Sequence, residues 1–137
     1  MVVEDLKEVR LGNIRPLSEY SHDLEALTGA LQERQRDIVR IAGSAGHFDA
    51  IPGSEPSKEF RRRVVETMDE IARRHIGERV LVFAHGGVIN VYVAEVLGLE
   101  KDFFFPAANT SITVVRSTGR DRVLFVLNDI AHVRRHG

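Results

Sequence analysis

The residues with the clearest chemical potential are His85, Gly86 and Gly87, which interrupt the apolar run VLVFAHGGVINVYV at 80–93. A strand before them and a helix after them would place the histidine where ligands bind in open α/β sheets. The glycines let a ligand approach the backbone, and free N–H groups at a helix start favour an anion. An imidazole there can donate a hydrogen bond to a phosphoryl oxygen. The pattern indicates a phosphate-handling site, and the alternative is a histidine that only caps or packs at the strand end.

The segments on both sides of this motif predict the elements that must position it. Residues 79–84 have a continuously apolar core, VLVFA, which suits a strand covered on both faces in a parallel sheet. Residues 88–97 fit a helix that Gly98 stops. Residues 111–116 and 122–127 are typical of strands, and the STGRD turn between them predicts an antiparallel hairpin.

Two further helices are expected ahead of the predicted strand. One helical face stays apolar over residues 18–42, and Gly43, Gly46 and IPGSEPS at 51–57 indicate the loop that follows. Ser57 is the predicted N-cap of a second helix, which Gly77 ends. The apolar face of this second helix consists of Phe60, Val64, Met68 and Ile71. The element order predicts an α/β fold, a three-layer sandwich of a mixed sheet and flanking helices, in a single domain over residues 1–137.

Composition excludes several classes of function. A formal net charge of -1 over 137 residues gives no global field that would favour nucleic acid or an anionic membrane. No apolar run approaches the roughly 18 residues that a membrane-spanning helix needs. Cysteine is absent, which excludes disulfides and thiolate chemistry and fits a reducing compartment, so we expect a cytoplasmic protein. Asp129 and His132 stand three apart, but two residues do not make a metal site, and no metal or other cofactor is expected.

Five blocks of the sequence, taken in order, resemble the histidine phosphatase superfamily, also called phosphoglycerate mutase-like. They are LKEVRLGN at 6–13, PGSEPSKEFRRRV at 52–64, RVLVFAHGGVI at 79–89, NTSITVV at 109–115 and LNDIAHV at 127–133. The resemblance implies a phosphoglycerate mutase-like α/β fold and phosphoryl transfer through a phosphohistidine. In that mechanism, arginines and a second histidine bind the phosphoryl oxygens, and a carboxylic acid protonates the leaving oxygen.

The resemblance also implies roles for individual residues. His85 matches the second histidine and Glu8 matches the acid/base glutamate, so both are expected to be catalytic. The backbone of Gly86 is expected to lie at the phosphate, and Asn109 is expected to shape the rim of the same substrate-binding site. The implied ligand is a phosphorylated small molecule or a phosphoprotein, and both phosphatase and phosphomutase activity stay open.

One expected part of the family motif set is missing ahead of Glu8. The family's nucleophile belongs to an Arg-His-Gly motif at the end of a first strand, and no such motif precedes Glu8. We therefore expect the C-terminal portion of an N-terminally incomplete fold, with weak or no activity for this chain alone. Arg135–His136–Gly137 spells the motif at the other end, but residues 128–134 separate it from the preceding apolar run. A frayed basic terminus is the favoured interpretation.

The missing strand would lie beside residues 80–84 in the family fold. Left unpaired, this apolar segment would be an edge that recruits other chains. We expect it to pair with a second copy in a homo-oligomer, with a separate chain, or with a rearranged segment of this chain. The alternative function is a non-catalytic remnant of the fold that binds a phosphate or a partner.

Overall fold

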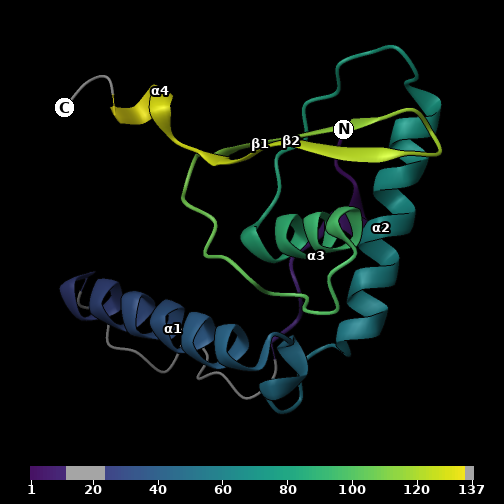
Figure 1. Cartoon of the computed structure of the whole chain (residues 1–137). Coiled ribbons are helices and arrows are strands. Elements are labelled where there is room, and N and C mark those ends of the chain that lie inside the picture. The colour runs from purple at the N-terminus through teal and green to yellow at the C-terminus, as the bar shows by residue number, and fades with distance from the viewer. Residues whose placement is uncertain (12–23, 135–137) are drawn as a thin grey trace.

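The computed structural model describes residues 1–11 and 24–134, which form several helices and a two-stranded sheet (Figure 1). Helix α3 lies in the middle of the view, α2 runs along one side of it, the hairpin lies above it, and α1 lies apart below (Figure 1). The main elements are α1 (Leu24–Ala45), α2 (Ser57–Arg74), α3 (Gly86–Leu97), β1 (Ile112–Ser117), β2 (Arg122–Asp129) and α4 (Ala131–Arg134). Short 3₁₀ helices cover Glu4–Leu6 and Phe48–Ala50. The mixture of helices and sheet confirms the predicted α/β class.

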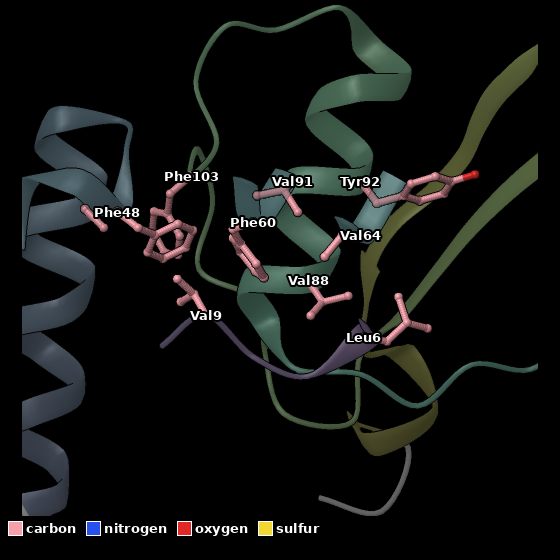
Figure 2. Close-up of a cluster of buried hydrophobic side chains, with 10 residues drawn as sticks. Leu6, Val9, Phe48, Phe60, Val64, Val88, Val91, Tyr92 and Phe103 are labelled. Carbon is pink, nitrogen blue, oxygen red and sulfur yellow. The ribbon is translucent and has the colours of Figure 1, made fainter. Parts of the chain in front are cut away.

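The hydrophobic core joins α2, α3, the N-terminal segment and the end of α1 (Figure 2). Phe48 lies where these elements meet, with its ring 5.6 Å from Phe60 and 5.8 Å from Phe103, both edge to face. Aromatic rings favour this arrangement because the positive edge of one meets the negative face of another. The buried cluster consists of Leu6, Val9, Ala42, Phe48, Phe60, Val64, Val88, Val91, Tyr92 and Phe103. The apolar face predicted for the second helix is confirmed, since Phe60 and Val64 are buried and Met68 and Ile71 pack against them.

Two of the sequence predictions with a local cause are confirmed. Strands β1 and β2 pair antiparallel, from Ile112 opposite Asp129 to Ser117 opposite Arg122, around the predicted turn. Helix α3 ends at Gly98, whose φ of 66° is left-handed and whose N–H donates to the carbonyls of the last turn. A residue without a Cβ adopts this conformation at little cost, which is why glycine ends the helix here.

Helix α2 corrects the role predicted for Ser57. Pro56 occupies the N-cap position, and Ser57 is the first helical residue. The Ser57 hydroxyl accepts the N–H of Phe48 at 3.0 Å, and the Ser57 N–H donates to the Asp49 carboxylate at 2.8 Å. The serine therefore ties the preceding 3₁₀ turn to α2 instead of capping its own helix. The helix ends at Arg74, ahead of the turn that contains Gly77.

Helix α1 is described over Leu24–Ala45 and ends three residues beyond the predicted end. The first six residues of the predicted helix, 18–23, lie outside the described residues. The helix passes through Gly43 and stops before Gly46, which has a φ of +79°. The Gly46 carbonyl then accepts the N–H groups of Asp102 at 2.7 Å and Phe103 at 3.0 Å. This close approach of two backbone segments fixes the turn after α1.

The buried parallel strand predicted at 79–84 is not formed within the described part of the chain. Residues 79–85 belong to the long connection from α2 to α3, and the sheet of the described residues is β1 and β2 alone (Figure 1). Leu81 and Phe83 are 79% and 88% exposed, whereas Val82 and Ala84 pack against the core. Alternation of this kind is typical of an extended chain. The segment has the pattern of a strand, but no described segment offers it a hydrogen-bonding neighbour.

Candidate active site

His85 and the two glycines that follow it form the start of α3. His85 is the N-cap residue in an extended conformation, and its carbonyl accepts the Ile89 N–H at 3.1 Å. Its imidazole is exposed and has no hydrogen-bond partner among the described residues. Gly86 and Gly87 are the first two helical residues, so their N–H groups lie at the positive end of the helix dipole. The predicted helix start beside the histidine is therefore present.

The Glu8 carboxylate lies against this helix start, although 79 positions separate it from Gly87 in the sequence. Its Oε2 accepts the Gly87 N–H at 3.0 Å, and its Oε1 accepts the Val9 N–H at 2.9 Å. The side chain is half-buried. A Cβ at position 87 would collide with Glu8 Oε1, so this contact requires a glycine. The structure thus places the predicted Glu8 against Gly87, the residue that follows the predicted Gly86.

An ion pair that was not predicted holds the segment carrying Glu8. Arg63 donates two hydrogen bonds to the Glu55 carboxylate, at 2.7 and 2.8 Å, and further ones to backbone carbonyls of residues 5–8. Hydrogen bonding to the Arg63 guanidinium holds the pKa of the Glu55 carboxyl below its ordinary value, and the same bond raises the pKa of Arg63. Both residues belong to the block PGSEPSKEFRRRV at 52–64. The sequence signal for this pair was an acidic residue, Glu55, just before a helix, followed eight positions later by a basic residue, Arg63, on that helix.

Asn90 was also missed, and it fixes the other side of the helix start. It is fully buried, and its amide nitrogen donates to the carbonyls of Gly86 and Phe105, both at 2.9 Å. Its Oδ1 accepts the N–H groups of Phe104 at 3.0 Å and Phe105 at 3.2 Å. Every hydrogen-bonding position of the amide is therefore used. An asparagine within the apolar helix sequence VINVYV was the signal, since a buried polar group must find partners.

The loop before β1 lies beside Gly86 and leads to Asn109. A Cβ at Gly86 would come 3.4 Å from the Ala107 side chain. Asn128 on β2 holds this loop, because its Oδ1 accepts the Ala108 N–H at 2.8 Å. Asn109 itself is exposed in the turn that follows, and its side chain makes no hydrogen bond with the described residues. Its place at the rim of the site stays a prediction.

His47 and Asp129, two further side chains that could take part in chemistry, form contacts away from this helix start. The His47 imidazole contacts the buried carboxylate of Asp102 at 2.8 Å. Asp129 accepts the Ala131 N–H at 2.8 Å and so caps the short helix α4. Within residues 1–11 and 24–134, no three side chains gather in the manner of a metal site. The same residues contain no helix that is both long and apolar enough to cross a bilayer.

These contacts define an α/β protein with an exposed imidazole, backbone N–H groups and a carboxylate around one helix start. Such groups can bind an oxyanion and exchange a proton with it. The chain belongs to the histidine phosphatase superfamily, because the family model for branch 1 of that superfamily matches residues 2–130. This match confirms the resemblance that the five sequence blocks indicated.

A curated relative makes the comparison more specific. The chain is 26% identical over 137 residues to the metal-independent phosphoserine phosphatase of Arabidopsis thaliana. The alignment covers 98% of this chain and 52% of the relative, so the chain spans about half the length of the curated protein it matches. No solved structure matches the chain significantly.

Proposed function

We propose that this chain supplies the acid/base and phosphate-binding side of a phosphoryl-transfer site that acts on a phosphate ester. The observation that carries the proposal is the Glu8 carboxylate on the Gly87 N–H, next to the exposed imidazole of His85. Membership of the histidine phosphatase superfamily supports phosphate-ester chemistry. The similarity to a phosphoserine phosphatase favours a small phosphomonoester as substrate.

In this proposal each group has one role. The phosphoryl oxygens lie against the first turn of α3, where the backbone N–H group of Gly86 and the imidazole of His85 donate hydrogen bonds to them. Glu8, held within reach by the Gly87 N–H, gives a proton to the leaving oxygen. Asn109 closes the rim on the side of the loop before β1.

The nucleophile is not assigned to any described residue. His47 and His75 are bound to Asp102 and Glu78, and His132 is exposed on α4. Loss of a nucleophile removes most of the rate in well-studied hydrolases, by factors on the order of 10⁴ or more. We therefore expect this chain alone to bind phosphate with little or no turnover. The second candidate function, a non-catalytic phosphate-binding protein, is favoured by the same observation.

We also propose that residues 80–84 pair with a strand from a second copy or from a separate chain. The support is the exposure of Leu81 and Phe83 on a segment with the alternating burial of a strand. Sedimentation velocity over a range of concentrations distinguishes the two possibilities, because self-pairing gives a concentration-dependent dimer of the purified chain. A clean monomer at all concentrations would exclude self-pairing.

The expectation of a cytoplasmic location stays a prediction.

The phosphate-binding proposal is tested by titrating inorganic phosphate and orthovanadate into the ¹⁵N-labelled chain. We expect concentration-dependent shifts of the Gly86 and Gly87 amide signals, strongly weakened in His85→Ala. His132→Ala is the matched control, because His132 is an exposed histidine on α4, and it should leave the shifts unchanged. Unmoved amide signals at saturating ligand would overturn the proposal.

Turnover of phosphoserine and of a generic phosphomonoester distinguishes the two candidate functions. We expect a rate near background for the chain alone. A robust rate that both His85→Ala and His136→Ala abolish would show that the chain is a complete enzyme, and it would contradict the expected inactivity. Phosphate binding without turnover would favour the non-catalytic function or the need for a partner.

A further inference from the structure

Arg63 makes an unusually complete set of contacts with the segment that carries Glu8. We infer that Arg63, locked by Glu55, is a positioning residue that holds the Glu8 carboxylate at the start of α3. The inference rests on the proposed function, since it concerns how the acid/base group is placed. It assigns a role to two side chains that do not themselves reach the helix start.

All the donors of the Arg63 guanidinium are used. Nη1 donates to the carbonyls of Asp5 at 2.8 Å and Lys7 at 2.9 Å, and Nη2 donates to the carbonyl of Glu8 at 3.3 Å. Nε and Nη2 donate to the two oxygens of Glu55. A guanidinium carries five N–H groups in a fixed planar fork, and each of them has an acceptor here. The side chain is 16% exposed and also covers the ring of Phe60, 4.7 Å from its centroid.

Glu55 fixes the same segment on the other side of Glu8. Its N–H donates to the Arg10 carbonyl at 2.7 Å, and its Oε2 accepts the Arg10 N–H at 3.4 Å. Residues 7–10 lie outside any helix or strand, so they lack the regular backbone hydrogen bonds that would hold Glu8 in place. The Glu55–Arg63 pair supplies those bonds instead, from residue 5 to residue 10. This bracket determines where the Glu8 carboxylate can lie.

Charge acts in the same direction as the hydrogen bonds. The pKa of Arg63 is raised, first by its hydrogen bond to Glu55 and then by the charges of Glu55, Asp5 and Glu8. The guanidinium therefore stays ionised and attracts the very segment that it binds. A lysine would keep the charge but lose the fork, because its three donors cannot serve a carboxylate and three carbonyls together.

Arg61 provides a matched control on the same helix. It is 19% exposed and forms ion pairs with Glu95 at 3.0 Å and Asp102 at 3.1 Å. It also donates to the carbonyls of Leu99 at 2.8 Å and Glu100 at 3.4 Å, which follow the far end of α3. Arg61 thus matches Arg63 in burial and bonding, but it has no contact with the Glu8 segment.

The test measures hydrogen exchange and the chemical shift of the Gly87 amide in Arg63→Lys and Arg61→Lys. We expect Arg63→Lys to speed exchange of the Gly87 N–H by about tenfold, the effect of losing one net hydrogen bond. We also expect it to move the Gly87 signal toward its position in Glu8→Gln. Arg61→Lys should leave both readings unchanged, even where it lowers the melting temperature as much as Arg63→Lys does.

Glu55→Gln keeps the inference testable if Arg63→Lys fails to fold, because it weakens the lock while Arg63 remains. It should change the Gly87 readings in the same direction. An unchanged Gly87 amide in both variants, or an equal change in Arg61→Lys, would overturn the inference. These readings need no phosphate and no turnover. A chain with the expected Gly87 changes and no phosphate binding would therefore contradict the proposed function and leave the positioning role intact.

Discussion

The two sides of the α3 start differ sharply in how complete they are. On one side, Glu8 and Asn90 bind backbone groups, Glu55 and Arg63 bind each other, and no buried side-chain polar atom of the described residues lacks a partner. On the other side, the segment ending at His85 exposes Leu81 and Phe83. The outer face of the hairpin likewise exposes Phe125 and Val123.

This difference shows that the hydrogen bonds that hold the site do not depend on whatever covers the exposed apolar side chains beside it. The polar contacts at the site connect segments far apart in the sequence, yet all their partners lie within the described residues. The apolar side chains beside the site have nothing in the described residues to cover them. The site's supports can therefore be tested independently of whatever pairs with residues 80–84.

The largest expected effect comes from removing a ring in the hydrophobic core. Phe60→Ala should lower the free energy of unfolding by about 3–5 kcal/mol, because Phe60 is fully buried and a cavity would remain. Phe83→Ala removes the same ring from an 88% exposed site and should change stability by less than about 0.5 kcal/mol. Chemical denaturation of both variants measures the contrast. Equal losses would show that residues 79–85 are already covered in the free chain.

Next in size is the buried amide on the polar side. Asn90→Leu keeps roughly the same volume but leaves the backbone groups of Gly86, Phe104 and Phe105 without their partner. We expect a loss of about 2–3 kcal/mol in the free energy of unfolding, since an unpaired buried polar group costs about 1–3 kcal/mol. Asn109→Ala is the control, and a comparable loss there would show that the exposed loop, not the amide, is what matters.

A smaller effect is expected where Glu8 meets the helix start. Gly87→Ala places a methyl group where Glu8 Oε1 lies, so the carboxylate must move away. We expect a cost of about 1–2 kcal/mol, within the usual range for overpacking. Gly86→Ala places its methyl group 3.4 Å from Ala107 and should be tolerated. Thermal unfolding compares the pair, and a greater loss for Gly86→Ala would contradict the geometry.

The ion pair that supports Glu8 should appear in the acid dependence of stability. The pKa of Glu55 is lowered in the folded chain by its hydrogen bond to Arg63, so its contribution is present above the ordinary carboxyl pKa of about 4.3. That contribution is lost as the pH falls through the lower, folded value. The difference in stability between the native chain and Glu55→Gln should therefore be largest near neutral pH and shrink in acid. Denaturation curves at several pH values measure it, and a difference that does not shrink would exclude this linkage.

The smallest effect on stability should accompany a large effect on association. Phe83→Ser should leave the free energy of unfolding within about 0.5 kcal/mol of the native value. If residues 80–84 pair between copies, it should also reduce dimer formation in sedimentation velocity. Leu31→Ser, at an exposed leucine on α1, is the control. Unchanged association in Phe83→Ser would place any self-interaction elsewhere.

What the sequence could predict follows from how local each cause is. The stop of α3 at Gly98 and the turn between β1 and β2 depend on neighbouring residues, and both predictions were confirmed. The strand predicted at 79–84 needs a hydrogen-bonding neighbour, which no local pattern can guarantee. Ser57 is a residue type that commonly occupies the N-cap, but its hydroxyl accepts a hydrogen bond from the Phe48 N–H, nine positions earlier.

The candidate site divides in the same way. His85 and the glycines stood out because polar and flexible residues interrupt an apolar run, and Glu8 was reached through the family resemblance alone. The Glu55–Arg63 pair and Asn90 escaped prediction because their partners are backbone groups. Backbone acceptors carry no residue identity, so a sequence cannot reveal which carbonyl a guanidinium or an amide will reach.

The Asn90 amide has a mechanical consequence. It binds the Gly86 carbonyl and the backbone of residues 104–105 at once, so these two stretches cannot shift independently. A ligand that displaces the first turn of α3 would therefore also move the loop before β1. Binding at the proposed phosphate site would then be transmitted to the loop before β1 through the Asn90 hydrogen bonds.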